Sequence, residues 1–424
     1  MVSTSPSFGP LLLLGLLAAL VGACTDGAVP QTGGQAGAAG TAGSGGAAGA
    51  AGTSSGAGGL AGSGGGGAGG TGGALAGAGG NSGGGAGGGG AGGIAGSGGV
   101  PVLDDWHFYG RWDLTEPSKA VTVNSGSHVT ATFNGTGISA TFDTSPNSGE
   151  IPTVSYTIDG GELVEEELSP TLELASGLGA GEHTVTLFTR GMDEKAERWT
   201  PPLVSCTVFL GFTVAGGNIV PTARPERLKM EFLGDSITEG VALHAQGPSG
   251  QTTATWRTDG PRGYAALTAQ ELGAEWRQVG FGRQGLTIVG NGGVPKAQDA
   301  FNWFYSGVER DAWQPDVVVI NQGTNDRSAT GETFAPLYLG FLELVRDAYP
   351  DAKIVAIRPF VGAFGSEIQA QVQARNDSGD TEVYYVDTDG WTSPEDFTDS
   401  VHPNESGSVK IRDLLVTALQ PILN

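Results

Sequence analysis

The fold follows from one stretch of sequence, DVVVINQGTND, which occupies residues 316–326. It contains four consecutive apolar, β-branched residues, Val317 to Ile320. A run of this kind is typical of a strand that is buried on both faces of a parallel sheet. Polar residues follow at once, and ligands of open parallel sheets bind where the strands end. The stretch therefore predicts an α/β sheet with a functional site at the end of this strand.

Strand and helix patterns alternate on both sides of this stretch, over residues 227–424. The other strand-like runs are Leu228–Leu233, Trp276–Phe281, Lys353–Phe360 and Glu382–Val386. Helix-like segments are Gly263–Leu272, Thr333–Ala348 and Glu405–Leu419. In the second of these, the apolar residues fall on one helical face, and Asn404 is a suitable N-cap for the third. We expect a doubly wound parallel sheet of the flavodoxin-like, three-layer kind.

Residues 101–222 show a different pattern, with short alternating runs and no competing helical period. These runs are His128–Phe133, Gly137–Asp143, Val154–Ile158, His183–Thr189 and Thr207–Val214. Turn residues separate them, for example Asn134-Gly135 and Asp159-Gly160-Gly161. The spacing predicts an all-β sandwich, of the jelly-roll type, in front of the α/β domain.

The first hundred residues differ sharply in composition from the rest. Of the 76 glycines, 36 lie between Gln31 and Val100, and Asp26 is the one charged residue before Asp104. A Gly/Ala/Ser/Thr tract without large side chains cannot bury a core, and it lacks the strict triplet repeat of collagen. We expect residues 24–100 to form a flexible tether with a root-mean-square span of roughly 45–50 Å.

An apolar run from Leu11 to Val21 is too short to span a bilayer and suits the core of an export signal. The residues that follow, Val21-Gly22-Ala23-Cys24, resemble a bacterial lipobox. The resemblance implies that residues 1–23 are removed and that Cys24 is lipidated, which would anchor the protein at the outer membrane or cell surface. No Lys or Arg precedes the run, so an ordinary signal peptide with a chance cysteine remains the alternative.

Charge and cysteine content exclude several classes of function. The chain has a net charge of −23 and no basic cluster, which argues against nucleic acid or an anionic lipid surface as a partner. Two cysteines, Cys24 and Cys206, cannot make a disulfide framework or a thiolate metal site. The histidines at positions 107, 128, 183 and 244 show no ligand spacing. We expect no metal and no cofactor, and membrane contact only through the lipid anchor.

Three polar clusters follow predicted strands or precede the last helix. They are Gly234-Asp235-Ser236, Gly323-Thr324-Asn325-Asp326 and Asp399-Ser400-Val401-His402. Acyl transfer through a covalent intermediate needs a serine, an imidazole that removes its proton and a carboxylate that orients the imidazole. An Asp three residues before a His can reach it across one turn. Asp396 is the rival of Asp399 for this role.

At these residues the chain closely resembles the SGNH (GDSL) hydrolase superfamily. The resemblance implies that Ser236 is the nucleophile, His402 the base and Asp399 its orienting acid. It also implies an oxyanion hole made by the Ser236 and Gly285 amides and the Asn325 side chain. The second motif block is looser, because Gly280 stands where many members have Asn, and Gly282 is the alternative to Gly285.

A β-sandwich followed by an SGNH domain resembles carbohydrate esterase family 2, whose members deacetylate xylan and glucomannan. Some of those members dispense with the triad acid. The resemblance predicts an acetylated polysaccharide as the substrate. Residues 244–262, rich in Gly, Thr and Gln, follow the nucleophile and are expected to shape the cleft. Trp391, eight residues before Asp399, is the candidate sugar-binding residue, and Trp256 and Tyr264, in or beside that segment, are further aromatic residues that could stack on sugar rings or pack in the core. A short-chain or lipase-like carboxylesterase and a non-catalytic carbohydrate-binding surface protein are the alternatives.

Overall fold

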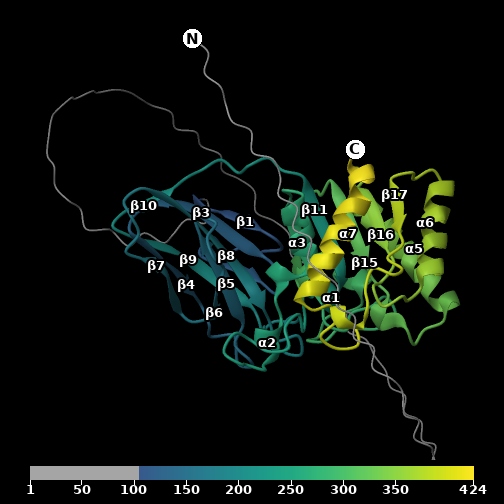
Figure 1. Ribbon diagram of the computed structural model, residues 1–424, viewed down its shortest axis with the longest axis horizontal. Helices are drawn as coiled ribbons and strands as arrows, with labels where there is room; N and C mark the ends of the chain where they lie inside the picture. Colours follow the sequence, from purple (N-terminus) through teal and green to yellow (C-terminus); the bar gives the residue numbers. More distant parts are fainter. Residues whose placement is uncertain (1–104) are drawn as a thin grey trace, which may run out of the picture. The chain divides into compact units, whose positions relative to one another are not determined.

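The computed structural model describes residues 105–424, which form an all-β part followed by an α/β part (Figure 1). The predicted signal peptide, Cys24 and the Gly-rich tether lie outside the described residues. Within residues 105–424, no helix is long and apolar enough to cross a membrane.

The α/β part is built on a parallel sheet with the strand order β12-β11-β15-β16-β17. This is the order 2-1-3-4-5 of flavodoxin-like doubly wound folds, and it agrees with the predicted fold. Its strands are β11 (Lys229–Asp235), β12 (Glu275–Phe281), β15 (Val317–Asn321), β16 (Lys353–Ile357) and β17 (Val383–Val386).

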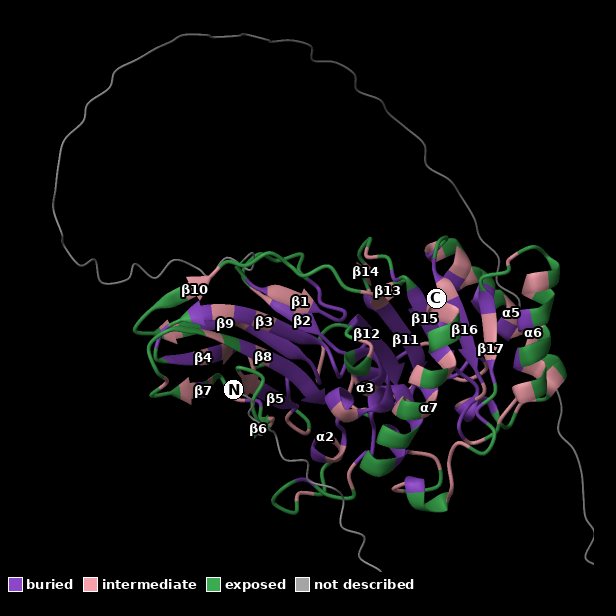
Figure 2. Cartoon of the chain, turned by 45° about the horizontal axis from the view of Figure 1, so that its top comes forward, coloured by how far each residue is buried: buried purple, intermediate pink, exposed green. Residues whose placement is uncertain are grey.

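Helices cover both faces of this sheet. The longer ones are α3 (Tyr264–Glu271), α5 (Gly331–Ala348), α6 (Gly365–Asp377) and α7 (Glu405–Leu423). Val317 and Val319 of β15 pack into a core cluster with α3 and α7, whereas Val318 and Ile320 pack into the cluster with α5 and α6. The apolar run is therefore buried on both faces because a helical layer lies against each one (Figure 2).

Short elements fill the connections of the α/β part. They are the α-helical turns α1 (Ser236–Glu239), α2 (Ala254–Arg257) and α4 (Ala297–Ala300), the hairpin β13 (Trp303–Tyr305) and β14 (Val308–Glu309), and 3₁₀ turns at Gly260–Arg262, Thr324–Asp326 and Pro394–Asp396. The sequence patterns did not predict the hairpin or α6. Helix α6 buries only Ile368 and Val372, so it lacks the apolar periodicity on which the prediction depended.

The all-β part consists of two antiparallel sheets that enclose one core. One sheet has the order β1-β3-β8-β5-β6, with β10 also paired to β3, and the other has the order β2-β9-β4-β7. Their strands are β1 (His107–Tyr109), β2 (Ala120–Thr122), β3 (His128–Asn134), β4 (Gly137–Phe142), β5 (Thr153–Ile158), β6 (Val164–Glu167), β7 (Thr171–Ser176), β8 (Glu182–Gly191), β9 (Thr207–Ala215) and β10 (Asn218–Val220). Phe133 and Phe209 come from opposite sheets and are both fully buried in this core. We refer to the first sheet as sheet A.

Buried arginines join the sandwich to the α/β part. The guanidinium of Arg111 donates to the carboxylate of Glu231 on β11 at 3.1 Å and to the backbone carbonyls of Phe301 and Trp303, each at 3.1 Å. The hydroxyl of Tyr349 donates to the same carboxylate at 2.7 Å. Both charged side chains of the pair are almost completely buried, so each depends on the other for compensation.

We predict that Arg111→Met destabilises the protein by about 3–5 kcal/mol, because it leaves the Glu231 carboxylate buried without a cation. The double variant Arg111→Met/Glu231→Gln should recover more than half of that loss. Lys119→Met is the matched control, since Lys119 pairs with Glu116 at the surface and such pairs contribute at most about 1 kcal/mol. Urea unfolding curves measure all three, and equal losses for Arg111→Met and Lys119→Met would contradict the prediction.

Candidate active site

The serine lies at the carboxyl end of β11, where the strand turns directly into α1. Asp235 caps α1 by accepting a hydrogen bond from the Ile237 amide at 2.9 Å. Gly234 permits the sharp turn, because a Cβ there would lie 2.0 Å from Thr238 Oγ1. Ser236 therefore opens the helix, and its amide lies among those that have no partner within the helix. The residue as a whole is 6% exposed.

His402 and Asp399 reach the serine from the loop before α7. His402 Nε2 lies 2.8 Å from Ser236 Oγ, and His402 Nδ1 lies 2.8 Å from Asp399 Oδ2. The other carboxylate oxygen of Asp399 accepts from the backbone amides of Val401 and His402, each at 2.9 Å. This arrangement places Nδ1–H on Asp399 and leaves Nε2 to accept the serine proton.

Hydrogen bonding keeps Asp399 ionised. Partial burial alone would raise the pKa of this carboxyl, but the hydrogen bonds from the His402 ring and from the Val401 and His402 amides outweigh it and hold the pKa below its ordinary value. Asp396 is engaged elsewhere, by Ser393 and by the ammonium of Lys410 at 2.8 Å. The geometry therefore brings Asp399, and not Asp396, to the histidine.

The residues predicted for the oxyanion hole lie together beside the serine. Asn325 Nδ2 donates to Asp235 Oδ2 at 3.2 Å and to the Gln284 carbonyl at 3.0 Å, and the Gly285 amide donates to the Ile288 carbonyl at 3.1 Å. These donors have protein partners in this structure. A substrate oxyanion would have to replace at least one of those partners, so the oxyanion assignments of Gly285 and Asn325 remain predictions.

Asp326 fixes the loop that carries Gly285. Its carboxylate accepts from the amides of Leu286 and Thr287 at 3.1 and 2.7 Å and from the Thr287 hydroxyl at 2.6 Å. A Cβ on Gly285 would lie 2.7 Å from that carboxylate, so only glycine fits. Sequence reasoning did not assign this role to Asp326, because neither residue type nor spacing indicates which loop an acidic side chain holds.

Asp235 is buried beside the serine and is the carboxylate that Asn325 contacts. Complete burial raises its pKa to about 6, despite the opposing hydrogen bond from the Ile237 amide. Gly280, the position at which the second motif block departs from the family, packs against the same turn. A Cβ there would lie 2.5 Å from both the Asp235 carbonyl oxygen and the Glu239 amide nitrogen, so the close packing excludes any side chain.

Two open cavities flank the loop of His402, and Phe397 lines both. One, of about 480 Å³, adjoins Asp399 and is lined by polar groups that include Arg327, Arg358 and Asp389. The other, of about 900 Å³, is lined by residues 243–246 among others, which belong in part to the segment predicted to shape the cleft. The surroundings of the triad therefore combine polar groups with apolar side chains such as Phe397, Leu243 and Val409.

The aromatic candidates are placed differently from the triad. Trp391 is half-buried and packs against the core cluster of α3 and α7, and it is not among the residues that line either flanking cavity. Trp256 lies under the guanidinium of Arg190, 5.5 Å from its ring centroid. Tyr264 is buried, with its hydroxyl 2.8 Å from Thr238 Oγ1. A sugar-binding role for Trp391 stays a prediction.

Two family models match the described chain. Residues 232–409 match the GDSL-like Lipase/Acylhydrolase family, and residues 108–222 match the Carbohydrate esterase 2 N-terminal domain.

Two curated relatives match the chain over part of their own length. The chain is 31% identical over 315 residues to the cellulase/esterase CelE of Acetivibrio thermocellus, covering 70% of this chain and 37% of the relative. It is 29% identical over 199 residues to an acetylxylan esterase / glucomannan deacetylase of Cellvibrio japonicus, covering 44% of this chain and 52% of the relative. The chain thus spans between about a third and a half of the length of the curated relatives it matches.

Solved structures support the fold over both parts. A family two carbohydrate esterase from Clostridium thermocellum, in complex with cellohexaose, is 29% identical with a TM-score of 0.64, covering 75% of this chain and 99% of that chain. A family two carbohydrate esterase from Cellvibrio japonicus has a TM-score of 0.64 at 20% identity, covering 76% and 96% of the two chains. The second likeness concerns the fold alone.

We predict that Asp399→Asn lowers kcat by about 10²- to 10⁴-fold with little change in KM, because His402 loses the partner that fixes its tautomer. In the unsubstituted protein, protonation of Asp399 should cause no fall in kcat/KM above about pH 4. The reason is that the pKa of Asp399 lies below its ordinary value. Rates measured between pH 4 and 9 test both statements.

Asp396→Asn serves as the matched control, since Asp396 lies three residues from Asp399 but contacts Lys410. It should retain kcat. An Asp399→Asn variant that keeps more than half of the activity would remove Asp399 from the catalytic machinery.

Proposed function

We propose that the protein is a serine esterase. Its substrates are acetylated plant-type polysaccharides, acetyl xylan or glucomannan, from which it removes acetyl groups. The match to a GDSL-like lipase/acylhydrolase model after a carbohydrate esterase 2 N-terminal model supports this proposal. The observation that carries the proposal is the hydrogen-bonded series Ser236–His402–Asp399, with 2.8 Å at each step.

The geometry supports a two-step acyl transfer. His402 Nε2 takes the hydroxyl proton of Ser236 as the oxygen attacks the acetyl carbonyl, and the Ser236 amide faces the developing oxyanion. His402 then gives that proton to the departing sugar oxygen, which leaves an acetyl group on Ser236. A water molecule, deprotonated by the same nitrogen, attacks the acetyl-enzyme and releases acetate. The proton returns to Ser236, so the side chains end as they began.

Polar groups around the triad favour a carbohydrate over a lipid substrate. The cavity beside Asp399 presents the charged side chains of Arg327, Arg358 and Asp389 among apolar ones such as Phe360 and Phe397. A long acyl chain requires a continuous apolar wall to bury its methylenes. A lipase-like activity on the same scaffold would need such a wall. The small acetyl group requires only the space next to Ser236.

We predict that the full chain releases acetate from acetylated xylan or glucomannan and that Ser236→Ala abolishes the release while leaving the fold intact. With 4-nitrophenyl esters, kcat/KM for acetate should exceed that for butyrate by about tenfold or more, since a site shaped for an acetyl group has no space for the extra methylenes. Acetate assays and circular dichroism provide the measurements.

Activity on the nitrophenyl esters alone would keep the serine mechanism and overturn the polysaccharide as substrate. Full activity of Ser236→Ala would refute the nucleophile. No activity of the unsubstituted protein on any ester would favour the non-catalytic carbohydrate-binding protein.

The N-terminal region extends the proposal to location. We infer that the protein is exported, that Cys24 is lipidated, and that residues 24–100 form the tether that holds the enzyme away from the membrane. We also propose that the β-sandwich has jelly-roll topology. Two or more acyl chains give stable anchoring, so Cys24→Ala should move the protein from the membrane fraction to the soluble fraction. Unchanged partitioning of Cys24→Ala would refute the anchor.

A further inference from the structure

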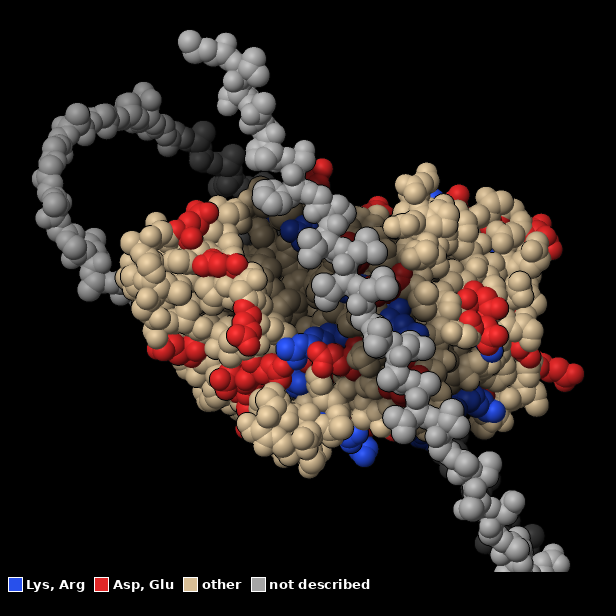
Figure 3. All heavy atoms as spheres, viewed as in Figure 1, with Lys and Arg blue, Asp and Glu red and all other residues tan. Residues whose placement is uncertain are grey.

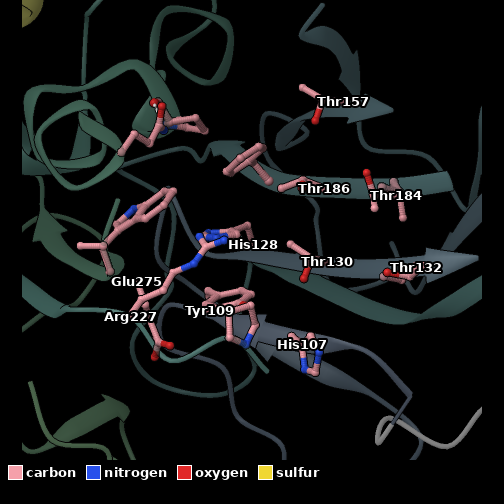
Figure 4. A pocket seen from close by; sticks show the side chains of 18 of the residues that line it. His107, Tyr109, His128, Thr130, Thr132, Thr157, Thr184, Thr186, Arg227 and Glu275 are labelled. Atoms are coloured by element: carbon pink, nitrogen blue, oxygen red, sulfur yellow. Dashed lines mark hydrogen bonds between the residues drawn. The ribbon is translucent and has the colours of Figure 1, made fainter. Parts of the chain in front are cut away.

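A separate cavity, of about 680 Å³, lies between the outer face of sheet A and the α/β part (Figure 4). Strands β1, β3, β5 and β8 form one wall, and α3 with the start of β12 contributes to the other. The space-filling view shows the surface hollowed between the two parts (Figure 3). The catalytic mechanism uses none of the residues that line it.

The cavity is remote from the catalytic serine. Its floor includes Trp276, which is paired in register with Met230 near the beginning of β11. Ser236 follows the other end of that strand, six residues further along. At about 3.3 Å per residue, the two points are roughly 20 Å apart. A ligand held at this floor does not occupy the acyl-transfer site.

Hydroxyl groups dominate the wall that sheet A provides. Strand register places polar side chains in two neighbouring rows: His107, Thr130, Thr186 and Thr157 in the first, and Thr132 and Thr184 in the second. Figure 4 shows these side chains along the strands at the cavity. Neighbours in a row are about 4.8 Å apart and the rows about 7 Å apart, so the hydroxyls form a grid on the scale of a sugar ring.

The hydroxyls at the centre of the grid are not used by the protein itself. Within residues 105–424, the side chains of Thr130, Thr157 and Thr186 make no hydrogen bond to a protein group, and all three are half-buried. Threonine hydroxyls both donate and accept, as sugar hydroxyls do. The wall can therefore bind a polyhydroxylated ligand without breaking any protein contact.

Aromatic rings close the inner end of the cavity. The His128 ring lies 4.9 Å from Tyr109 and 4.4 Å from Trp276, measured between centroids. Burial lowers the pKa of His128 to about 3, so this floor is uncharged at neutral pH. The indole N–H of Trp276 is buried and has no acceptor within the described chain. An unpaired donor of this kind is costly.

One cation at the cavity is not neutralised by a carboxylate. Arg262 is held by Glu165 and Asp259, and Glu275 is held by Arg224. The remaining charged side chain that lines the cavity is Arg227, which is exposed and has no ion pair within residues 105–424. In Figure 4 it extends toward His128. The cavity thus combines neutral hydroxyls with a single free guanidinium.

We propose that this cavity binds an oligosaccharide that carries a carboxylate, that is, a glycan with a uronic acid residue. The Arg227 guanidinium presents a planar pair of donors that matches a carboxylate, and the threonine grid takes the sugar hydroxyls. A volume of about 680 Å³ is ordinary for a ligand pocket and holds a few sugar rings. The site retains the polysaccharide while its acetyl groups are removed elsewhere on the protein.

The test measures binding by titration calorimetry in the full-length Ser236→Ala protein, so that no turnover interferes. The probes are xylotriose substituted with methylglucuronic acid and unsubstituted xylotetraose. We expect the acidic probe to bind about tenfold or more tightly, the usual effect of a charge-assisted hydrogen bond. Arg227→Ala should abolish that preference, because Arg227 supplies the unpaired charge.

Isosteric variants separate the threonine grid from a general effect on folding. Thr130→Val with Thr186→Val should weaken binding of both probes severalfold. Thr213→Val is the matched control, since Thr213 is exposed on β9 of the other sheet, and it should change neither affinity. Equal affinities for the two probes, or a preference that survives Arg227→Ala, would overturn the proposal.

The inference rests on the proposed function only for the class of glycan, and the two fail separately. Arg227→Ala should leave kcat/KM for 4-nitrophenyl acetate unchanged, because Arg227 contacts no residue of the triad. If the unsubstituted protein released no acetate, the proposed function would be overturned. Loss of the probe preference, with acetate release intact, would overturn the second site alone.

Discussion

The active site depends on the close packing of two glycines at the ends of neighbouring strands. Gly234 on β11 and Gly280 on β12 are paired in register. A Cβ on Gly234 would lie 2.0 Å from Thr238 Oγ1, and a Cβ on Gly280 would lie 2.5 Å from the Asp235 carbonyl oxygen. Their lack of side chains lets α1 turn directly over the sheet. That turn points Ser236 toward His402 and Asp235 toward Asn325. A larger residue at either position would displace Ser236 from His402 and from the donors predicted for the oxyanion hole.

The donors predicted for the oxyanion hole hydrogen-bond to protein groups near the same turn. Asn325 is held by the Asp235 carboxylate and the Gln284 carbonyl, and Gly285 by the Ile288 carbonyl. Buried donors without partners are costly, and local acceptors pair with the donors that we predict for the oxyanion hole. Exchange for the oxyanion is favourable because a full negative charge accepts more strongly than a carbonyl does. The raised pKa of Asp235, about 6, shows that its own hold on a negative charge is weakened by burial.

Much of this arrangement could be predicted from the sequence, because it depends on local patterns. The strand that contains Val317 to Ile320, the polar clusters after the strands and the Asp399–His402 spacing each occupy a few consecutive residues. The interactions that could not be predicted join distant segments. The buried pair of Arg111 and Glu231 and the hydrogen bonds that Asp326 accepts from the loop of Gly285 are examples. Helix α6 was missed for a different reason, because it buries only two apolar residues.

The threonine grid failed to stand out for a related reason. Thr130, Thr157 and Thr186 each fit the solvent face of an alternating strand, and nothing in the sequence states which threonine lies beside which. Strand register supplies that information. The same holds for two histidines, because the spacing of His107 and His128 in the sequence does not indicate that they share a site. The structure places both at the wall or floor of one cavity.

The net negative charge of the protein and the unpaired charge of Arg227 act on a glycan ligand in opposite directions. A net charge of −23 disfavours a polyanion, whose many carboxylates would each meet the negative surface. A polysaccharide with occasional uronic acid residues is a different ligand. Salt screens the field of distant charges beyond about 8 Å at physiological ionic strength, whereas contact with Arg227 acts at hydrogen-bonding distance. One free guanidinium in a neutral, hydroxyl-lined cavity can therefore select an isolated carboxylate that the overall charge does not repel strongly. The protein then discriminates by the density of acidic groups along the glycan and not by their presence.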